Sequence, residues 1–314
     1  MTGPDRGRAL VVGEALIDVV EHADGTVSRF PGGSPANVAL GLGRLGRAVD
    51  LLTWLGPDAD GDLVRAHLAA SGVRVLPGDA TRTSTARARL DRNGTASYRF
   101  DLEWDLPDPS AEPAGPPLVV HTGSIAGVLE PGATRVAATV ARHRDTATVT
   151  YDPNLRPALM GTPEKAAPHV EALVALADVV KVSDEDLAWY APGTPDHEVV
   201  RRWAASGPGL VVVTRGGAGA WAVTRAGVEV EVAPVRVEVV DTVGAGDSFM
   251  AGLIDGLWSA GVLGAHRRDA VGALDRSTVA AVLERCAAIA AITVSRAGAD
   301  PPRRDELAPR GPRP

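Results

Sequence analysis

The stretch that decides the fold is residues 240–252, which read Val-Asp-Thr-Val-Gly-Ala-Gly-Asp-Ser-Phe-Met-Ala-Gly. The β-branched run Val235–Val240 at its start predicts a strand, and the apolar residues of Phe249–Trp258 recur at helical spacing. The small residues 244–246 lie between these runs and predict a tight turn. The expected order is therefore strand, glycine turn and helix.

Such a turn is suited to a phosphoryl group. The first amides of a helix have no partner inside the helix, and the positive end of the helix dipole lies behind them. Gly244, Ala245 and Gly246 would therefore hold an anion through backbone N–H groups. Asp247 follows directly, where its carboxylate could take the proton of a hydroxyl that attacks the phosphoryl group. The alternative is that Asp247 only caps the helix, since Asp is favoured there.

The composition limits the class of protein. With 314 residues, of which 45% are hydrophobic, the chain suits one large α/β domain or two smaller ones. The net charge of −7 argues against nucleic acid or an anionic membrane as the partner, and the single cysteine, Cys286, excludes a disulfide within the chain. The apolar run Ala9–Gly13 is too short for a signal peptide, and no run reaches the ~18 apolar residues that cross a bilayer. We therefore expect a cytoplasmic protein.

Short β-rich runs alternate with helical segments along most of the chain, which predicts a mostly parallel sheet with helices on both faces. Ligands bind at the C-terminal ends of the strands in such sheets. The expected strands are Ala9–Gly13, Val49–Leu55, Leu118–His121, Ala147–Tyr151, Asp178–Val182 and Leu210–Thr214. The expected helices are Ala36–Leu45, Asp62–Ser71, Ala133–His143, Pro163–Ala177 and Val199–Ser206.

Two segments break this alternation. Ala15–Glu21 with Val27–Phe30, and Ser84–Leu90 with Ala96–Asp101, read as two hairpins. We expect them, within residues 14–31 and 84–104, to form a small sheet that closes over the site as a lid. An exposed extension with no moving role is the alternative. The remaining chain is expected to form one domain that ends in a disordered tail, residues 302–314.

Further candidate residues follow the expected strands. Gly32 and Gly33 allow close backbone approach to a ligand, and Asn37 offers a donor and an acceptor, as a polyol needs. A plain turn is the alternative there. Arg156 could bind phosphate or a sugar oxygen, or form a surface salt bridge.

The acidic run Lys181–Leu187 is the candidate metal site. Glu185 or Asp186 could hold Mg²⁺ through a water molecule, whereas by composition alone the run is the start of a helix. The chain contains no Walker sequence, no protein-kinase set of motifs and no HExxH, which excludes those classes of enzyme.

Residues 241–252 and 30–39 resemble the two signatures of the ribokinase-like (PfkB) carbohydrate kinases, and the resemblance extends from Gly13 to Gly298. It implies a ribokinase-like three-layer α/β/α sandwich with a mostly parallel central sheet and a small β-sheet lid. It implies that Asp247 is the catalytic base and that residues 244–246 form the anion hole. The residues implied for the sugar are Asp18, Gly32, Gly33, Asn37 and Arg156.

The same resemblance implies ATP, Mg²⁺ and a monovalent cation such as K⁺. Asn154 matches a position beside the transferred phosphate, and Thr214, Gly216 and Gly219 match a nucleotide-binding loop. Ser183 and Asp186 stand where most members have an Asn and a Glu tied to magnesium and phosphate, and this departure leaves the metal ligands open.

The expected reaction is the ATP-dependent phosphorylation of a primary hydroxyl of a monosaccharide. Asp152–Pro157 and Arg87–Leu106 look most like bacterial fructokinases, so fructose is the first expectation. The alternatives are 2-keto-3-deoxygluconate, ribose or a nucleoside as substrate, and, from a different class, a catalytically silent sugar-binding regulator. Because lid sheets in this family often pair across a dimer, a homodimer is expected.

Overall fold

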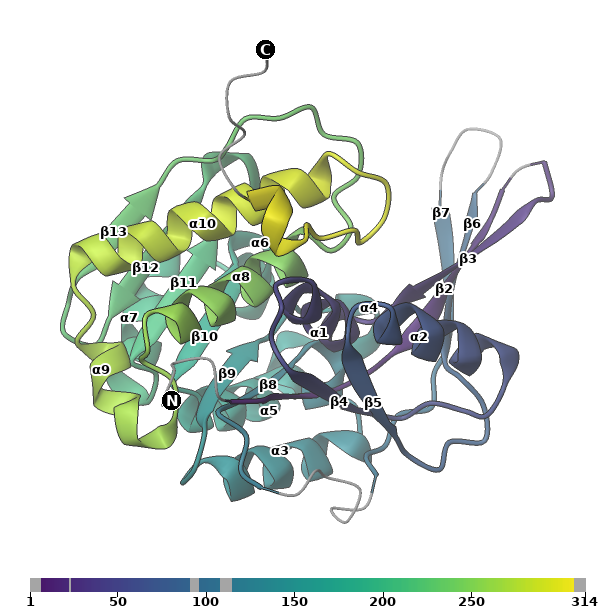
Figure 1. Ribbon diagram of the computed structural model, residues 1–314, viewed down its shortest axis with the longest axis horizontal. Coiled ribbons are helices and arrows are strands. Elements are labelled where there is room, and N and C mark those ends of the chain that lie inside the picture. The colour runs from purple at the N-terminus through teal and green to yellow at the C-terminus, as the bar shows by residue number, and fades with distance from the viewer. Residues whose placement is uncertain (1–6, 23, 91–95, 108–114, 308–314) are drawn as a thin grey trace.

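A nine-stranded sheet forms the centre of the molecule in the computed structural model, which describes residues 7–22, 24–90, 96–107 and 115–307 (Figure 1). The strand order is β13-β12-β11-β10-β9-β8-β1-β4-β5. Neighbours from β11 to β5 are parallel, and β12 and β13 add an antiparallel edge. The strands are β1 (Ala9–Val12), β4 (Val49–Thr53), β5 (Val73–Pro77), β8 (Val119–Gly123), β9 (Thr148–Asp152), β10 (Val179–Ser183), β11 (Leu210–Thr214), β12 (Ala220–Thr224) and β13 (Glu229–Val232).

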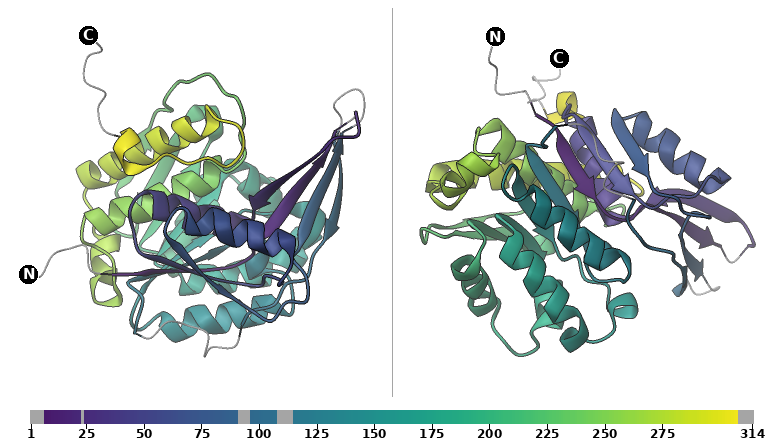
Figure 2. Two further views of the ribbon diagram at one scale, coloured as in Figure 1. Left: turned by 45° about the vertical axis from the view of Figure 1, so that its right-hand side comes forward. Right: turned by 90° about the horizontal axis from the view of Figure 1, so that it is seen from below.

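Helices cover both faces of this sheet, as the alternation predicted (Figure 2). The fully buried strand β1 sends Ala9 and Val11 into one apolar cluster and Leu10 and Val12 into the other, because successive side chains of a strand point to opposite faces. The first cluster lies under α1 (Ser34–Arg44), α2 (Ala59–Ala69), α8 (Ala245–Ser259) and α10 (Arg276–Val294). The second lies under α3 (Gly132–His143), α5 (Pro163–Leu176), α6 (Asp184–Tyr190) and α7 (Asp196–Ser206), with the short α4 (Pro157–Met160) nearby, while α9 (Arg268–Gly272) follows α8.

The two predicted hairpins form a second sheet, in the order β3-β2-β6-β7, which projects from the main body (Figure 1). Its strands are β2 (Leu16–Glu21), β3 (Val27–Gly32), β6 (Thr85–Leu90) and β7 (Ala96–Asp101). Each hairpin is antiparallel, and the two meet through the parallel pair β2 and β6. The small sheet is therefore built from segments more than fifty residues apart, and the turn at 91–95 lies outside the described residues.

The predicted strand Val235–Val240 is wrong. The segment leaves the sheet after β13 and runs as a loop, in which Val235, Val239 and Val240 are 47%, 60% and 60% exposed. It joins the fold at its end, where the N–H of Val240 donates to the carbonyl oxygen of Val294 at 2.8 Å. β-branched residues fit a pleated surface, but they cannot supply a neighbouring strand, and β13 already occupies the edge.

The C-terminal segment also differs from expectation. Residues 302–307 are part of the fold rather than of a disordered tail, because Arg304–Leu307 forms a 3₁₀ helix and Arg304 donates to Asp255 at 2.5 Å. Residues 308–314 lie outside the description. By length and composition α10 meets the criterion for a membrane span, contrary to the expectation that no run would. However, it packs along α8 and buries Leu283, Cys286 and Ile289, as a core helix does.

Candidate active site

The first turns of α1 and α8 face each other and enclose the side chain of Asp247. Ser34 Oγ donates to Asp247 Oδ1 at 2.7 Å, and Asn37 Nδ2 donates to Asp247 Oδ2 at 2.8 Å. Asp247 is 7% exposed and lies in the first turn of α8, after Gly244 in the left-handed conformation at φ 74°. The carboxylate therefore does more than cap its own helix: it joins two segments of the chain 213 residues apart.

Asn154 reaches the same carboxylate from the end of β9. Its backbone has φ 38°, in the left-handed region, and its Nδ2 donates to Asp247 Oδ1 at 3.4 Å. Arg156 Nη1 donates in turn to Asn154 Oδ1 at 2.7 Å, which fixes the orientation of the amide. Asn154 and Arg156, which the sequence placed near phosphate or sugar, thus lie beside Asp247.

Asp18 approaches from the small sheet. Its side chain lies against Gly32, where a Cβ atom would lie 2.1 Å from Asp18 Oδ2, so a larger residue there would displace the Asp18 carboxylate. Burial raises the pKa of Asp18 to about 6; the positive charge of Arg156 opposes this rise, and the negative charge of Asp247 adds to it. Asp18, from strand β2 of the small sheet, and Asp247, from helix α8, therefore belong to one electrostatic site. Gly33 contacts the same junction, since a Cβ atom there would lie 2.5 Å from the carbonyl oxygen of Glu14.

The glycine turn leaves its amides open. The N–H of Ala245 donates to the carbonyl oxygen of Thr242 at 3.2 Å, but within the described residues the N–H groups of Gly246 and Asp247 have no acceptor. They lie at the start of a 15-residue helix, where an anion is favoured.

Lys181 and Asp152 lie beneath this turn and were not singled out from the sequence. Lys181 Nζ donates to Asp152 Oδ2 at 2.9 Å, and the two side chains are 3% and 0% exposed. Burial opposes the charge of Lys181, but the carboxylates of Asp152, Asp186 and Asp247 hold its pKa above the usual value. Burial also raises the pKa of Asp152 to about 6, although Lys181 opposes this rise. Ser34 was missed as well, because its partner is distant in the sequence.

Ser183 and Asp186 form a capping box at the start of α6. Ser183 Oγ accepts from the N–H of Asp186 at 3.0 Å, and Asp186 Oδ2 accepts from the N–H of Ser183 at 3.2 Å. The other oxygen, Oδ1, accepts from the N–H of Leu155 at 2.8 Å. Backbone amides thus engage both oxygens of Asp186, while Glu185 is exposed, and the described residues contain no group of three potential metal ligands.

The predicted nucleotide loop follows β11. Gly219 has φ 95°, and a Cβ atom there would lie 2.1 Å from the carbonyl oxygen of Val232, so the β11–β12 hairpin itself requires this glycine. Gly216, at φ 48°, has open space around the Cβ position. Thr214 Oγ1 donates to the carbonyl oxygen of Val182 at 3.5 Å. Among the described residues, this loop has no hydrogen bond with Asp247 or with the side chains that bind it.

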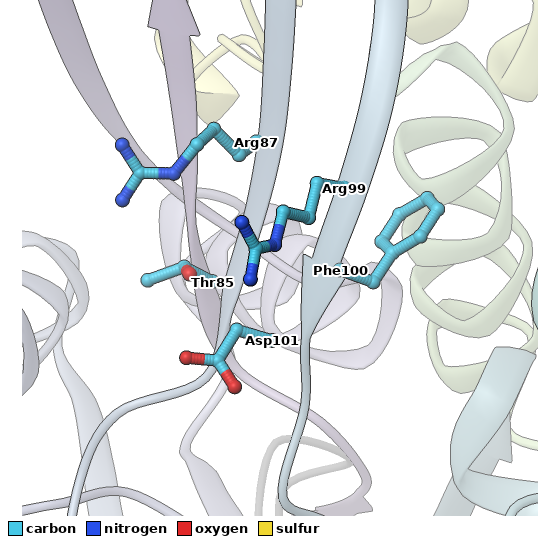
Figure 3. A pocket seen from close by; sticks show the side chains of 5 residues that line it. All are labelled: Thr85, Arg87, Arg99, Phe100 and Asp101. Atoms are coloured by element: carbon cyan, nitrogen blue, oxygen red, sulfur yellow. The ribbon is translucent and has the colours of Figure 1, made fainter.

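A hollow of about 360 Å³ lies elsewhere, on the small sheet, where Thr85, Arg87, Arg99, Phe100 and Asp101 line it (Figure 3). Arg87 and Arg99 are paired across β6 and β7 and project together, whereas the ring of Phe100 points away from them. Asp18 pairs with the neighbouring Ala86, so the alternation along β2 and β6 puts Asp18 on the opposite face. The hollow is therefore separate from the Asp247 site.

Comparisons with known proteins show the family of this chain. The profile of the pfkB family carbohydrate kinases matches residues 7–306. The chain is 36% identical to a fructokinase of Klebsiella pneumoniae over 267 residues, which cover 82% of this chain and 86% of that protein. It is 32% identical to a fructokinase of Escherichia coli over 309 residues, which cover 95% and 97%.

Two solved structures share the whole architecture. A fructokinase of Xylella fastidiosa with bound ATP superposes with a TM-score of 0.83 at 28% identity and covers 96% of each chain. A double mutant of the Vibrio cholerae fructokinase, with fructose, ADP and potassium, superposes with a TM-score of 0.83 at 26% identity and covers 98% of each chain. The likeness thus extends over the central sheet, the small sheet and the site between them. The chain belongs to the pfkB family of carbohydrate kinases, and its fold is ribokinase-like.

Proposed function

We propose that this protein is an ATP-dependent fructokinase, which transfers the γ-phosphoryl group of ATP to the primary hydroxyl of fructose and forms fructose 6-phosphate. The observation that carries the proposal is the buried Asp247 carboxylate, which Ser34 and Asn37 hold beside two unpaired helix amides. The relatives named fructokinase point to fructose as the sugar.

Asp247 is the general base in this reaction. An ionised carboxylate offers about four acceptor positions. Ser34, Asn37 and Asn154 use three of them, so one remains for the hydroxyl of the sugar. As the sugar oxygen forms its bond to the γ-phosphorus, its proton passes to Asp247, the bond from phosphorus to the β,γ-bridging oxygen breaks, and ADP leaves. The loose transition state requires positioning more than basicity, so an aspartate suffices.

The sugar is held between the two sheets. Asp18 accepts hydrogen bonds from sugar hydroxyls, Asn37 and Arg156 supply donors, and Gly32 and Gly33 allow the backbone to approach the ring. The small sheet acts as a lid, since it carries Asp18 toward Asp247, and its closure excludes water from the transfer.

The nucleotide lies over the ends of β10 and β11. The open N–H groups of Gly246 and Asp247 receive the γ-phosphoryl group at the 244–246 turn. Asn154, Ser183, Thr214, Gly216 and Gly219 bind the remaining phosphates and the nucleoside. The exposed valines of the preceding loop, Val239, Val240 and Val243, supply an apolar surface for the flat purine ring. The ATP bound in the Xylella fastidiosa fructokinase structure supports ATP as the phosphoryl donor.

Mg²⁺ enters with ATP in this proposal and is held mainly by the phosphates. Mg²⁺ keeps several waters and uses one or two carboxylates, so Glu185 or Asp186, in the first turn of α6, would act on it through water. Potassium activation is proposed from the potassium-bound Vibrio cholerae structure, and comparing turnover in potassium and sodium salts tests it.

We further infer a cytoplasmic homodimer that pairs through the lid sheets. The support is the family resemblance together with exposed apolar residues on the small sheet, where Val27 and Phe30 are 54% and 53% exposed. Sedimentation equilibrium of the wild type and of Phe30→Ser tests this proposal. A wild type that stays monomeric at micromolar concentration overturns it.

Asp247→Asn is the test of the proposed function, measured by ATP consumption over fructose, 2-keto-3-deoxygluconate, ribose and nucleosides. We expect fructose to be the preferred substrate of the wild type, and kcat to fall by about 10²–10⁴-fold in the variant while sugar binding survives. Asp62→Asn is the matched control, because Asp62 also lies in the first turn of a helix but is 77% exposed. A wild type that binds a sugar without consuming ATP identifies a silent regulator, and unchanged turnover in Asp247→Asn removes Asp247 from the mechanism.

A further inference from the structure

Lys181 is a buried cation in this site, with a side chain that is 3% exposed. Of the 32 lysines and arginines in the chain, only Lys165 and Lys181 are lysines, and Lys181 is the buried one. Its ammonium group has three N–H donors. Within the described residues only one acceptor is present for them, Asp152 Oδ2 at 2.9 Å. A buried ammonium therefore keeps two donors that no protein group uses.

These donors lie against the glycine turn. A Cβ atom built on Gly246 would lie 2.9 Å from Lys181 Nζ, so the ammonium is in contact with the backbone whose N–H groups have no acceptor. Donors from the start of α8 and from the end of β10 thus meet at one place. A group that accepts from both must have several oxygens, as a phosphoryl group does.

The negative charges around Lys181 would oppose the binding of a phosphoryl group without a nearby cation. Lys181 faces the carboxylates of Asp152, Asp186 and Asp247. His121, behind it, stays neutral, because burial lowers its pKa to about 3 and Lys181 adds to that effect. Three carboxylates would repel an incoming phosphoryl group, and the lysine offsets them from within the protein.

We propose that Lys181 is a catalytic residue for the transfer proposed above: its ammonium donates a hydrogen bond to a non-bridging oxygen of the transferred phosphoryl group, and Asp152 is the positioning residue that holds it there. The lysine stays protonated throughout, and the proton of the sugar still passes to Asp247. A compact ammonium fits this space beside Gly246, whereas a planar guanidinium needs more room. Electrostatic stabilisation of this kind is typical of phosphoryl transfer.

The competing interpretation is that Lys181 and Asp152 form only a structural ion pair. Buried pairs of that kind often contribute little net stability, and an apolar pair of similar volume replaces them without loss. The two interpretations differ in what they predict for kcat, so turnover of folded variants distinguishes them.

Lys181→Met is the test, with Lys165→Met on the exposed face of α5 as its matched control. We expect kcat to fall about 10²–10³-fold in Lys181→Met, as for the loss of one donor to a developing charge. The dissociation constant for fructose should change less than threefold, and Lys165→Met should behave as wild type. Lys181→Arg should not restore kcat. If Lys181→Met does not fold, Lys181→Met/Asp152→Asn, which leaves no lone buried charge, takes its place.

The scarcity of lysine also allows a direct observation. Protein labelled with ¹³C and ¹⁵N in lysine should show two side-chain signals, and the one absent from Lys181→Met belongs to Lys181. We expect that signal to shift when ADP, aluminium fluoride and fructose are added together, and the Lys165 signal to stay. A folded Lys181→Met with wild-type kcat, or an unmoved Lys181 signal, overturns the inference. A wild type that phosphorylates no sugar instead overturns the proposed function, so the two failures are distinguishable.

Discussion

At the scale of single residues, the carboxyl groups of Asp247 and Glu14 differ in their hydrogen bonds and burial. Asp247 has a donor on each oxygen, and Ser34 and Asn37 bind the ionised form. Glu14, at the junction of the two sheets, is fully buried, and its Oε2 accepts from the N–H of Ala126 at 3.2 Å. Burial raises the pKa of Glu14 to about 7, although its hydrogen bonds and the charge of Arg156 oppose this rise.

Glu14→Gln should therefore change the pH dependence of stability. The pKa of Glu14 rises from 4.5 in a free chain to about 7 in the folded protein, so its contribution to stability is complete below pH 4.5 and is lost as the pH rises through 7. The neutral glutamine avoids this loss. We expect the unfolding free energy of Glu14→Gln to exceed that of the wild type by roughly 3 kcal/mol at pH 8, and the two to converge near pH 4.5. Urea unfolding at several pH values measures the difference, with the exposed Glu284→Gln as control; a gap that does not depend on pH contradicts it.

Asp18 gives a second pH effect, on sugar binding. Its pKa of about 6 means that the carboxylate loses its charge, and an acceptor, in mildly acidic solution. We expect the KM for fructose to rise as the pH falls below about 6, while KM for ATP stays nearly constant. In Asp18→Asn, KM for fructose should be high at every pH. A wild-type KM that is flat from pH 5 to 8 would remove Asp18 from the sugar site.

At the scale of elements, the contact of α1 with α8 sets the position of the base. The two helices approach closely because Gly41 of α1 lies opposite Ala251 of α8. A Cβ atom at Gly41 would lie 2.7 Å from the Cβ atom of Ala251. Gly43 lies on another side of the same helix, where a Cβ atom would lie 2.3 Å from the carbonyl oxygen of Ser71. Only the first glycine therefore controls the spacing of α1 from Asp247.

Gly41→Ala and Gly43→Ala form a matched pair for testing this spacing. Both insert a methyl group into a tight contact, which typically costs about 1–3 kcal/mol. We expect Gly41→Ala to lower kcat about tenfold or more, since a small misplacement of a catalytic group is costly, while Gly43→Ala keeps kcat near wild type. Thermal unfolding and steady-state kinetics of both variants provide the comparison, and equal kcat values would show that the helix spacing does not matter.

At the scale of the whole molecule, the site lies between the main body and the small sheet, whose residues Ile17 and Val19 pack into the same apolar cluster as α1 and α8. The small sheet supplies Asp18 and Gly32, and the main body supplies Asp247 and Lys181. The chain passes from the small sheet to the main body beside Gly33, at φ 102°, and the small sheet projects from the body (Figure 1). This arrangement allows the small sheet to move toward the body when ligands fill the space.

Closure should be visible by hydrogen exchange in Asp247→Asn, in which we expect turnover to be about 10²–10⁴-fold slower. We expect fructose with ATP to slow amide exchange in β2, β3, β6 and β7 more than either ligand alone, because only the ternary complex is bounded by both sheets. The strands β12 and β13, at the far edge of the main sheet, serve as the internal control. Protection confined to the main body would make the small sheet a static extension.

Elements whose signals are local could be predicted from the amino-acid sequence. The strand and helix alternation, both hairpins and the helix that starts beside Asp247 follow from the spacing of apolar residues and from glycine, and the structure has them within a few residues. The tertiary structure alone decided which distant groups meet. Val235–Val240 has the composition of a strand but no neighbour to pair with. Ser34 reaches Asp247 across 213 residues, and Lys181, from the middle of β10, brings its ammonium group against Gly246. The physical reason is that propensity and periodicity are properties of adjacent residues, whereas hydrogen bonds, burial and charge depend on which segments the packed core brings into contact.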